Sequence, residues 1–245
     1  MTPPAQADRA ARPGEPPAEV GRLTVGVLGG TGPQGRGLAV RFAAAGQRIL
    51  LGSRDAERAA EVAVDVAERA RGIAADGVEV SVGGGSNADV AGAADLVVVA
   101  VPFDGHGATL AALTAPLAGK IVVDCVVPMG FDKQGAYVLD VPEGSVTQQA
   151  AALLPDSSVV GAFHHLSAVL LEDLGRPALD GDVMVVGDDR AATDTVQALA
   201  GRLPGMRGVY AGRLRNARQV EALTINLVSI NRRYKVHAGV RVTDV

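Results

Sequence analysis

Short apolar runs alternate with segments of helical periodicity through the first half of the chain. The apolar runs predict strands at 23–28, 48–51, 78–82, 96–101 and 121–127. The segments between them predict helices at about 34–45, 55–71 and 105–113. Residues 96–101 lack a polar interruption, as expected for a strand that is buried on both faces. This alternation predicts an α/β fold, a Rossmann-type doubly wound parallel sheet built from βαβ units.

The pattern becomes less regular in the second half. Further strands are expected at 159–163, 183–186 and 209–210, with helices at 145–154, at about 190–201 and at about 213–236. Residues 1–21 contain five prolines and no apolar stretch, so we expect a disordered tail there. The expected organisation is therefore this tail, a Rossmann domain at 22–150, and a smaller C-terminal part at 151–245 that ends in a long helix.

The last predicted helix carries apolar residues on two faces. One seam, with alternating spacings of three and four, consists of Val220, Leu223, Leu227, Ile230 and Tyr234. A second face consists of Ala222, Ile225 and Val228. A helix that is apolar on two sides usually packs against two partners. We expect one to be the Rossmann domain and the other a second copy of the chain, in a homodimer.

Composition narrows the class of protein. The chain is 48% hydrophobic and 20% charged, which is typical of a globular protein, and no apolar run approaches the length of a membrane span. The single cysteine, Cys125, suits a reducing cytoplasm. The net charge is −4, and we expect neither nucleic acid nor a membrane as partner. Residues 213–245 nevertheless hold seven cations against two acids, which indicates either a solvated helix face or an attractor for an anionic ligand.

A glycine-rich turn follows the first predicted strand and precedes the first helix. Gly30, Gly32 and Gly35 have the G-x-G-x-x-G spacing. Such a turn lets backbone N–H groups approach a pyrophosphate at the positive end of the next helix. In this strand–turn–helix context the motif predicts a dinucleotide site.

The end of the second strand indicates which dinucleotide binds. An NAD site usually has an acidic residue there for the ribose 2′-hydroxyl, but this chain has Ser53 and Arg54, with Arg58 one helical turn later. Two guanidinium groups and a hydroxyl suit a dianionic 2′-phosphate, so we expect NADP. The alternative is a surface ion-pair cluster with Asp55 and Glu57.

Two strand ends should lie beside the nicotinamide, because ligands bind at the carboxyl edge of such sheets. One strand ends in Val101-Pro102 and the next in Val127-Pro128. Together they predict a dry slot, which suits hydride transfer and is poor for hydrolysis. Each could also be a simple strand terminus.

His164 and His165 follow a predicted strand, and Cys125 lies at the end of another. Adjacent residues on a strand point to opposite faces, so the two histidines form a poor metal site. His164 is a candidate ligand contact or a core residue, and Cys125 is expected to be a core thiol. No catalytic residue and no metal site are predicted.

Several segments together resemble the NADP-dependent reductases of coenzyme F420, in order from residue 23 to the C-terminus. They are Gly29-Gly30-Thr31-Gly32-Pro33-Gln34-Gly35, Gly52-Ser53-Arg54 with Arg58, Val101-Pro102, Val127-Pro128, Ala162-Phe163-His164, Gly187-Asp188-Asp189, Asn216-Ala217-Arg218 and Gly239-Val240-Arg241-Val242. The resemblance implies that Thr31, Gly32, Pro33 and Gln34 hold NADP together with Ser53, Arg54 and Arg58. It also implies that the strand-end valines and Ala168 line the nicotinamide side, and that Arg218 lies at the deazaflavin side. One departure is Ser167, where members of the family have proline.

The resemblance implies hydride transfer between NADP(H) and the deazaflavin coenzyme F420. This reaction needs alignment and exclusion of water rather than a nucleophile. An imine or β-hydroxyacid reductase is the alternative enzyme; such enzymes use a proton donor on a helix after the Rossmann domain, and Asn231 and Lys235 have a matching spacing. A non-catalytic NADPH-sensing protein is the other alternative, and it would need no second apolar slot.

Overall fold

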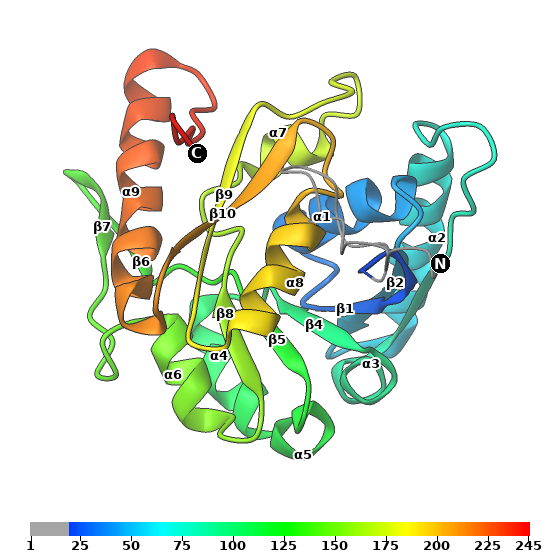
Figure 1. Ribbon diagram of the computed structural model, residues 1–245, viewed down its shortest axis with the longest axis horizontal. Coiled ribbons are helices and arrows are strands. Elements are labelled where there is room, and N and C mark those ends of the chain that lie inside the picture. Colours follow the sequence, from blue (N-terminus) through cyan, green and yellow to red (C-terminus); the bar gives the residue numbers. More distant parts are fainter. Residues whose placement is uncertain (1–19) are drawn as a thin grey trace, which may run out of the picture.

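The computed structural model describes residues 20–245. The tail expected at 1–21 lies outside the described residues, except that Val20 and Gly21 belong to a short 3-10 helix, Val20–Arg22. One eight-stranded sheet forms the centre of the molecule, in the order β10-β9-β8-β5-β4-β1-β2-β3, with helices on both faces (Figure 1). Within residues 20–245 no helix combines the length and apolar character needed to cross a membrane.

The expected βαβ units form the first half of the sheet. Its elements are β1 (Thr24–Leu28), α1 (Pro33–Ala44), β2 (Arg48–Ser53), α2 (Ala56–Arg71), β3 (Val82–Ser86), α3 (Asn87–Ala93), β4 (Leu96–Val99), α4 (Phe103–Ala111), α5 (Thr114–Leu117) and β5 (Ile121–Asp124). These strands are mutually parallel, and all four residues of β4 are buried. The doubly wound parallel fold is therefore confirmed for this half.

The third strand was predicted at the wrong place. Residues 78–82 have the β-branched composition of a strand, but β3 begins at Val82 and continues through three glycines to Ser86. The reason is packing against α2. A Cβ on Gly84 would lie 2.2 Å from the carbonyl oxygen of Ala59, so only glycine lets this strand lie flush under the helix.

The second half continues the same sheet. Its elements are α6 (Val146–Leu153), β8 (Ser158–Gly161), α7 (Ala168–Glu172), β9 (Gly181–Gly187), α8 (Arg190–Ala200) and β10 (Met206–Gly212). Strand β8 pairs in parallel with β5, β9 runs antiparallel to β8, and β10 runs parallel to β9. The expected boundary at residue 150 lies in α6, between β5 and β8, which pair in the same sheet.

Two hydrophobic cores lie on the opposite faces of the sheet. One contains Leu38, Val66 and Leu199, from α1, α2 and α8. The other contains Val90 and Leu110, from α3 and α4, together with residues of α6. Alternate residues of β4 contribute to each core, as expected for a strand covered on both sides.

The last helix, α9 (Ala217–Tyr234), packs against α6, β9 and a hairpin that sequence analysis missed. The hairpin consists of β6 (Met129–Asp132) and β7 (Gly135–Val138). Part of the apolar surface that was assigned to a second subunit is covered within the chain, since Val220 packs with Val186 and Met184 of β9. Val220 and Leu227 of the predicted seam are buried within the chain, whereas Ile230 and Tyr234 are exposed.

Candidate cofactor cavities

A large cleft opens where β1 and β2 end and α1 begins. Its volume is about 1040 Å³. Ten of the predicted site residues line it: Gly29, Thr31, Gly32, Pro33, Gln34, Ser53, Arg54, Arg58, Val101 and Pro102. The structure therefore brings together the glycine turn, the end of β2 and the end of β4.

The glycine turn can adopt its shape only because its glycines carry no side chain. Gly29 has a φ of +72°, and a Cβ there would lie 2.8 Å from the carbonyl oxygen of Ala100. A Cβ on Gly35 would lie 2.8 Å from the carbonyl oxygen of Gly29. Gly30 does not line the cleft but packs over Leu51, with its N–H donating to Gly52. Helix α1 begins at Pro33 without a side-chain cap, so its first N–H groups are available to an anion.

The end of β2 leaves two guanidinium groups available. Asp55 caps α2 by accepting a hydrogen bond from the Arg58 N–H at 3.0 Å, and its own N–H donates to Ser53 Oγ at 3.2 Å. The alternative ion-pair cluster does not form among residues 20–245, where neither Arg54 nor Arg58 has an acidic partner within 4.0 Å. Both arginines therefore line the cleft without a neighbouring carboxylate to neutralise their charge.

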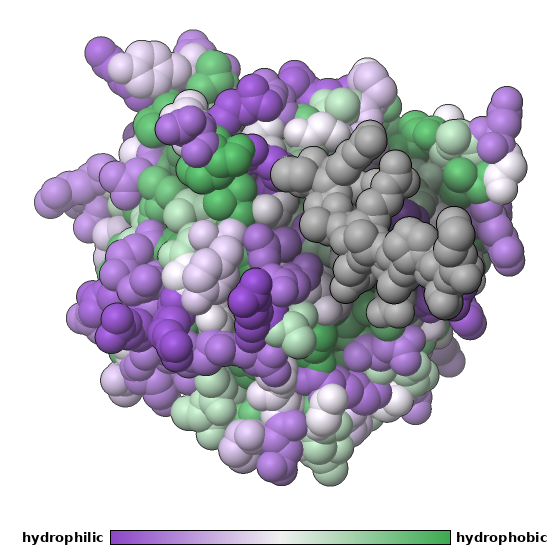
Figure 2. Space-filling view, viewed as in Figure 1, coloured by the Kyte–Doolittle hydropathy of each residue, from purple (hydrophilic) through white to green (hydrophobic). Residues whose placement is uncertain are grey.

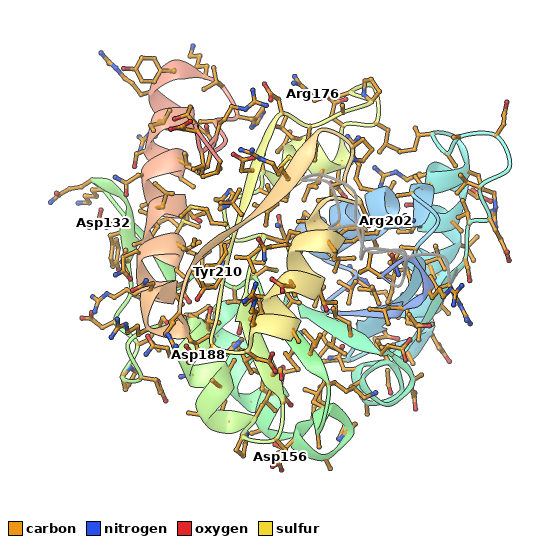
Figure 3. All side chains as sticks on the ribbon, in the orientation of Figure 1. Asp132, Asp156, Arg176, Asp188, Arg202 and Tyr210 are labelled. Carbon is orange, nitrogen blue, oxygen red and sulfur yellow. The ribbon has the colours of Figure 1, made fainter. Side chains whose placement is uncertain are left out.

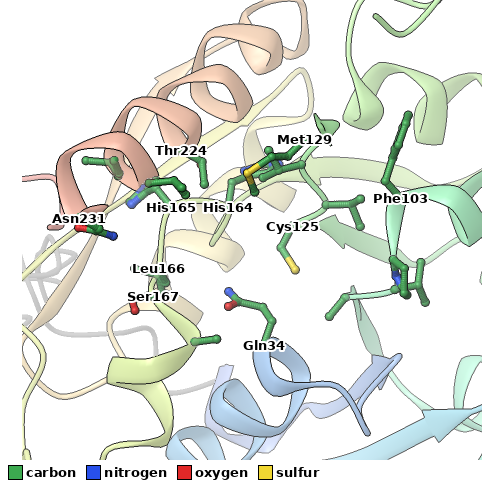
Figure 4. Close-up of a pocket in the computed structure, with 18 of the residues that line it drawn as sticks. Gln34, Phe103, Cys125, Met129, His164, His165, Leu166, Ser167, Thr224 and Asn231 are labelled. Carbon is green, nitrogen blue, oxygen red and sulfur yellow. The ribbon is translucent and has the colours of Figure 1, made fainter. Parts of the chain in front are cut away.

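A second cavity, of about 410 Å³, adjoins the cleft. The carboxyl ends of β4 and β5 form one wall and the middle of α9 forms the other (Figure 4). The predicted residues Val127, His164 and Ala168 line it, as do Cys125, Met129, Thr224, Leu227, Val228 and Asn231. Four residues line both spaces: Gln34, Ala100, Val101 and Pro102. The two cavities therefore meet at the end of β4.

A left-handed residue, Phe163, directly precedes the segment 164–168 that lines the second cavity. Phe163 has a φ of +65°, is fully buried, and packs edge-on against Phe42 with ring centroids 5.9 Å apart. Its carbonyl oxygen accepts a hydrogen bond from Gln34 Nε2 at 3.2 Å. Because β8 ends at Gly161, the strand argument for His164 and His165 was wrong, and both histidines line the same cavity.

Three buried polar atoms beside this cavity have no hydrogen-bond partner among the described residues. They are Nδ1 of His164, Nδ1 of His165 and Oγ1 of Thr224. Nε2 of His165 accepts from the Met184 N–H at 3.1 Å, so the neutral ring carries its proton on Nδ1. Burial lowers the pKa of each histidine to about 4, so both are neutral at pH 7. Unpaired buried polar atoms are costly, and their gathering here indicates a polar ligand.

Two buried acidic residues near the histidines, Glu221 and Asp124, form hydrogen bonds within the chain. Glu221 of α9 accepts from the N–H groups of Val146 and Thr147, both at 3.0 Å, and from Thr147 Oγ1 at 2.8 Å. Burial raises the pKa of Glu221, and these donors offset only part of the rise. Asp124, at the end of β5, lies 2.6 Å from His106 Nε2. Burial by itself would lower the pKa of His106, but the hydrogen bond and charge of Asp124 raise it overall.

Besides Gly30, two predicted site residues line neither cavity. Pro128 is buried, and its carbonyl oxygen accepts from the Leu139 N–H at 2.8 Å. Arg218 is 58% exposed at its side chain and lies 3.5 Å from Asp140. Cys125 lies in the second cavity, but its thiol donates to the Val99 carbonyl and burial raises its pKa, as expected for an unreactive thiol.

A dinucleotide cleft at the carboxyl edge of a parallel sheet, joined to a second ligand cavity, defines a Rossmann-type dinucleotide-dependent protein. The family described as NADP oxidoreductase, coenzyme F420-dependent, matches residues 24–128. The chain is 38% identical over 228 residues to the F420-dependent NADP reductase of Methanothermobacter thermautotrophicus, covering 91% of this chain and 96% of that one. The corresponding reductase of Methanocaldococcus jannaschii is 36% identical over 228 residues, covering 91% and 99%.

A solved structure supports the same grouping. The candidate F420-dependent NADP reductase of Arthrobacter sp. FB24 matches with a TM-score of 0.70 at 28% identity, covering 89% of this chain and 98% of that one. The chain belongs to the family of F420-dependent NADP reductases.

Proposed function

We propose that the protein transfers a hydride directly between NADP(H) and the deazaflavin coenzyme F420. The observation that carries this proposal is the junction of the two cavities, which share Gln34, Ala100, Val101 and Pro102. A nicotinamide that enters from the cleft and a deazaflavin in the second cavity would meet at this junction. Membership of the family supports both cofactors.

On the NADP side, residues 22–150 supply the binding groups. The N-terminus of α1 and the turn from Gly29 to Gln34 would hold the pyrophosphate. Ser53, Arg54 and Arg58 would hold the 2′-phosphate through charge-assisted hydrogen bonds. Ser53 and Arg54 occupy the end of β2 and the Asp55 carboxylate caps α2, which favours NADP over NAD.

On the deazaflavin side, residues 151–245 complete the cavity. The flat ring fits between the strand-end valines, Val101 and Val127, and the apolar face of α9. The unpartnered Nδ1 atoms of His164 and His165 would meet its polar edge. Because both rings are neutral at pH 7, the slot carries no histidine charge, and the walls can align the two rings while excluding water.

The alternatives fit these cavities less well. For a reductase of imines or β-hydroxyacids, Asn231 lines the second cavity, but Lys235, the second residue of the matching spacing, is exposed, follows α9, and lines neither cavity. A protein that only senses NADPH has no use for a second cavity opening onto the nicotinamide end of the first.

Isotope transfer tests the proposal. NADPH carrying deuterium stereospecifically at the reactive carbon is mixed with oxidised F420, and the reduced deazaflavin is analysed by mass spectrometry while its absorbance is followed. We expect bleaching of the deazaflavin and retention of the label from one face of the nicotinamide. Label released to solvent, or no bleaching, would contradict direct transfer.

We further propose that the protein acts as a cytoplasmic homodimer. Hydrophobic surface gathers beside the C-terminal half of α9 (Figure 2). There Tyr234 is 70% exposed, and Ile230 and Val236 are also exposed. Burying such a patch against a second copy would remove apolar area from water.

A further inference from the structure

A basic groove lies next to the second cavity, between the β6–β7 hairpin and the C-terminal half of α9. Its volume is about 480 Å³. Phe131, Lys133, Val228, Arg232 and Arg233 are among the residues that line it. Figure 3 shows the hairpin, marked by Asp132, alongside the helix.

The groove adjoins the second cavity. Val228 lines both spaces. Met129, which lines the cavity, is the first residue of β6, and Lys133 follows the last. A ligand that extended from the cavity past Val228 would therefore approach these cations.

Cations from two separate elements converge in the groove. Arg232 and Arg233 lie in the last turn of α9, where positive charge also favours the helix dipole. Lys133 lies in the turn of the hairpin, so the dipole of α9 does not explain why a cation is found at this position. A Cβ on Gly135 would lie only 3.7 Å from Arg232 Nη1, which places this guanidinium beside the turn.

These three cations have no acidic partner within 4.0 Å among residues 20–245. Asp132, on the same turn, accepts hydrogen bonds from the N–H groups of Gln134 and Gly135 at 2.7 and 3.1 Å. Its carboxylate therefore holds the turn. Three cations without an acidic partner in one groove favour the binding of an anionic ligand there.

We propose that this groove binds the anionic tail of the deazaflavin substrate, a phosphodiester followed by glutamates. This inference rests on the proposed function, which places the ring of the same molecule in the adjoining cavity. Lys133, Arg232 and Arg233 then determine affinity for the tail and leave the hydride-transfer geometry unaffected.

The test compares F420 with the 5-deazaflavin nucleoside that lacks the phosphate and the glutamates. The variant Lys133→Gln/Arg232→Gln/Arg233→Gln should raise the Kd and KM for F420 about tenfold. This estimate takes the loss of each exposed charge pair to weaken binding roughly threefold or less. The Kd and KM for the tail-less compound should change less than twofold. Rising salt should weaken the wild-type protein's preference for F420, because the contacts are exposed.

The matched control, Arg71→Gln/Arg176→Gln/Arg190→Gln, makes the same change of charge at exposed positions outside the groove. It should leave the preference for F420 intact. Equal losses for F420 and the tail-less compound, an unchanged Kd for F420, or an equal effect of the control would each overturn the proposal. Binding is measured by deazaflavin fluorescence, so it reports on the groove even if hydride transfer, and with it the proposed function, fails.

Discussion

Mild acid should weaken the fold through the two neutral histidines beside the second cavity. His165 is 3% exposed, and burial lowers its pKa from the ordinary 6.5 to about 4. Between these two values the unfolded chain binds a proton that the folded chain does not. Stability is therefore complete above pH 6.5 and is lost as the pH falls towards 4.

The size of the effect follows from this shift. A proton that binds at 6.5 in the unfolded chain and at about 4 in the folded chain costs about 2 kcal/mol of stability at pH 5. The variant His165→Gln removes the titration but keeps an oxygen that can accept the Met184 N–H. The difference between the two proteins isolates His165, because the opposite contribution of His106, whose pKa is raised, is present in both.

Urea unfolding at pH 7.5 and pH 5, followed by circular dichroism, measures this difference. The wild-type protein should lose about 2 kcal/mol more than His165→Gln over that interval. His164→Gln should behave alike, because burial also lowers the pKa of His164 to about 4. If His165→Gln loses as much stability as the wild-type protein, the imidazole is not held neutral by burial and the reasoning fails.

Three further predictions concern the cofactors and the oligomer. Arg54→Ala should weaken NADPH binding about tenfold to a hundredfold, because a charge-assisted pair contributes roughly 1.5–3 kcal/mol. NADH binding should be nearly unchanged, and equal losses for the two cofactors in titration calorimetry would refute the 2′-phosphate assignment. Tyr234→Asp combined with Ile230→Asp should halve the mass measured by light scattering, whereas a wild-type monomer at micromolar concentration would refute the homodimer. Arg218→Ala should leave both the KM for F420 and the melting temperature nearly unchanged, because its side chain lines neither cavity and its exposed contact with Asp140 contributes little stability. A several-fold rise in the KM for F420 would instead place Arg218 at the deazaflavin side, as the family resemblance implies.

The dinucleotide cleft was predictable because its determinants are local. The glycine turn sits between a strand and the helix that immediately follows, and Arg54 comes directly after β2. Such positions follow from chain order alone, since parallel strands bring their carboxyl ends to one edge. The residues of the turn and of the β2 end accordingly meet in one cleft.

The second cavity was only partly predictable because its walls are distant in the sequence. The ends of β4 and β5 were expected there, but α9 lies about a hundred residues further on and its approach depends on tertiary packing. One signal was present in the helix. Thr224 and Asn231 are two turns apart on the face that carries Leu227 and Val228. Polar residues on an otherwise apolar helix face indicate that this face borders a ligand cavity rather than a purely apolar packing interface.

Directional polar contacts lie near both ends of α9, the helix that forms one wall of the second cavity. Near its N-terminus, Glu221 accepts the hydrogen bonds of Val146 and Thr147 at the start of α6. Near its C-terminus, Asn231 Oδ1 accepts from the Ala238 N–H at 2.6 Å. Apolar contacts tolerate sliding, whereas these directional contacts do not. Because a buried carboxylate is costly unless hydrogen-bonded, the three donors around Glu221 fix the N-terminal part of α9 against the start of α6.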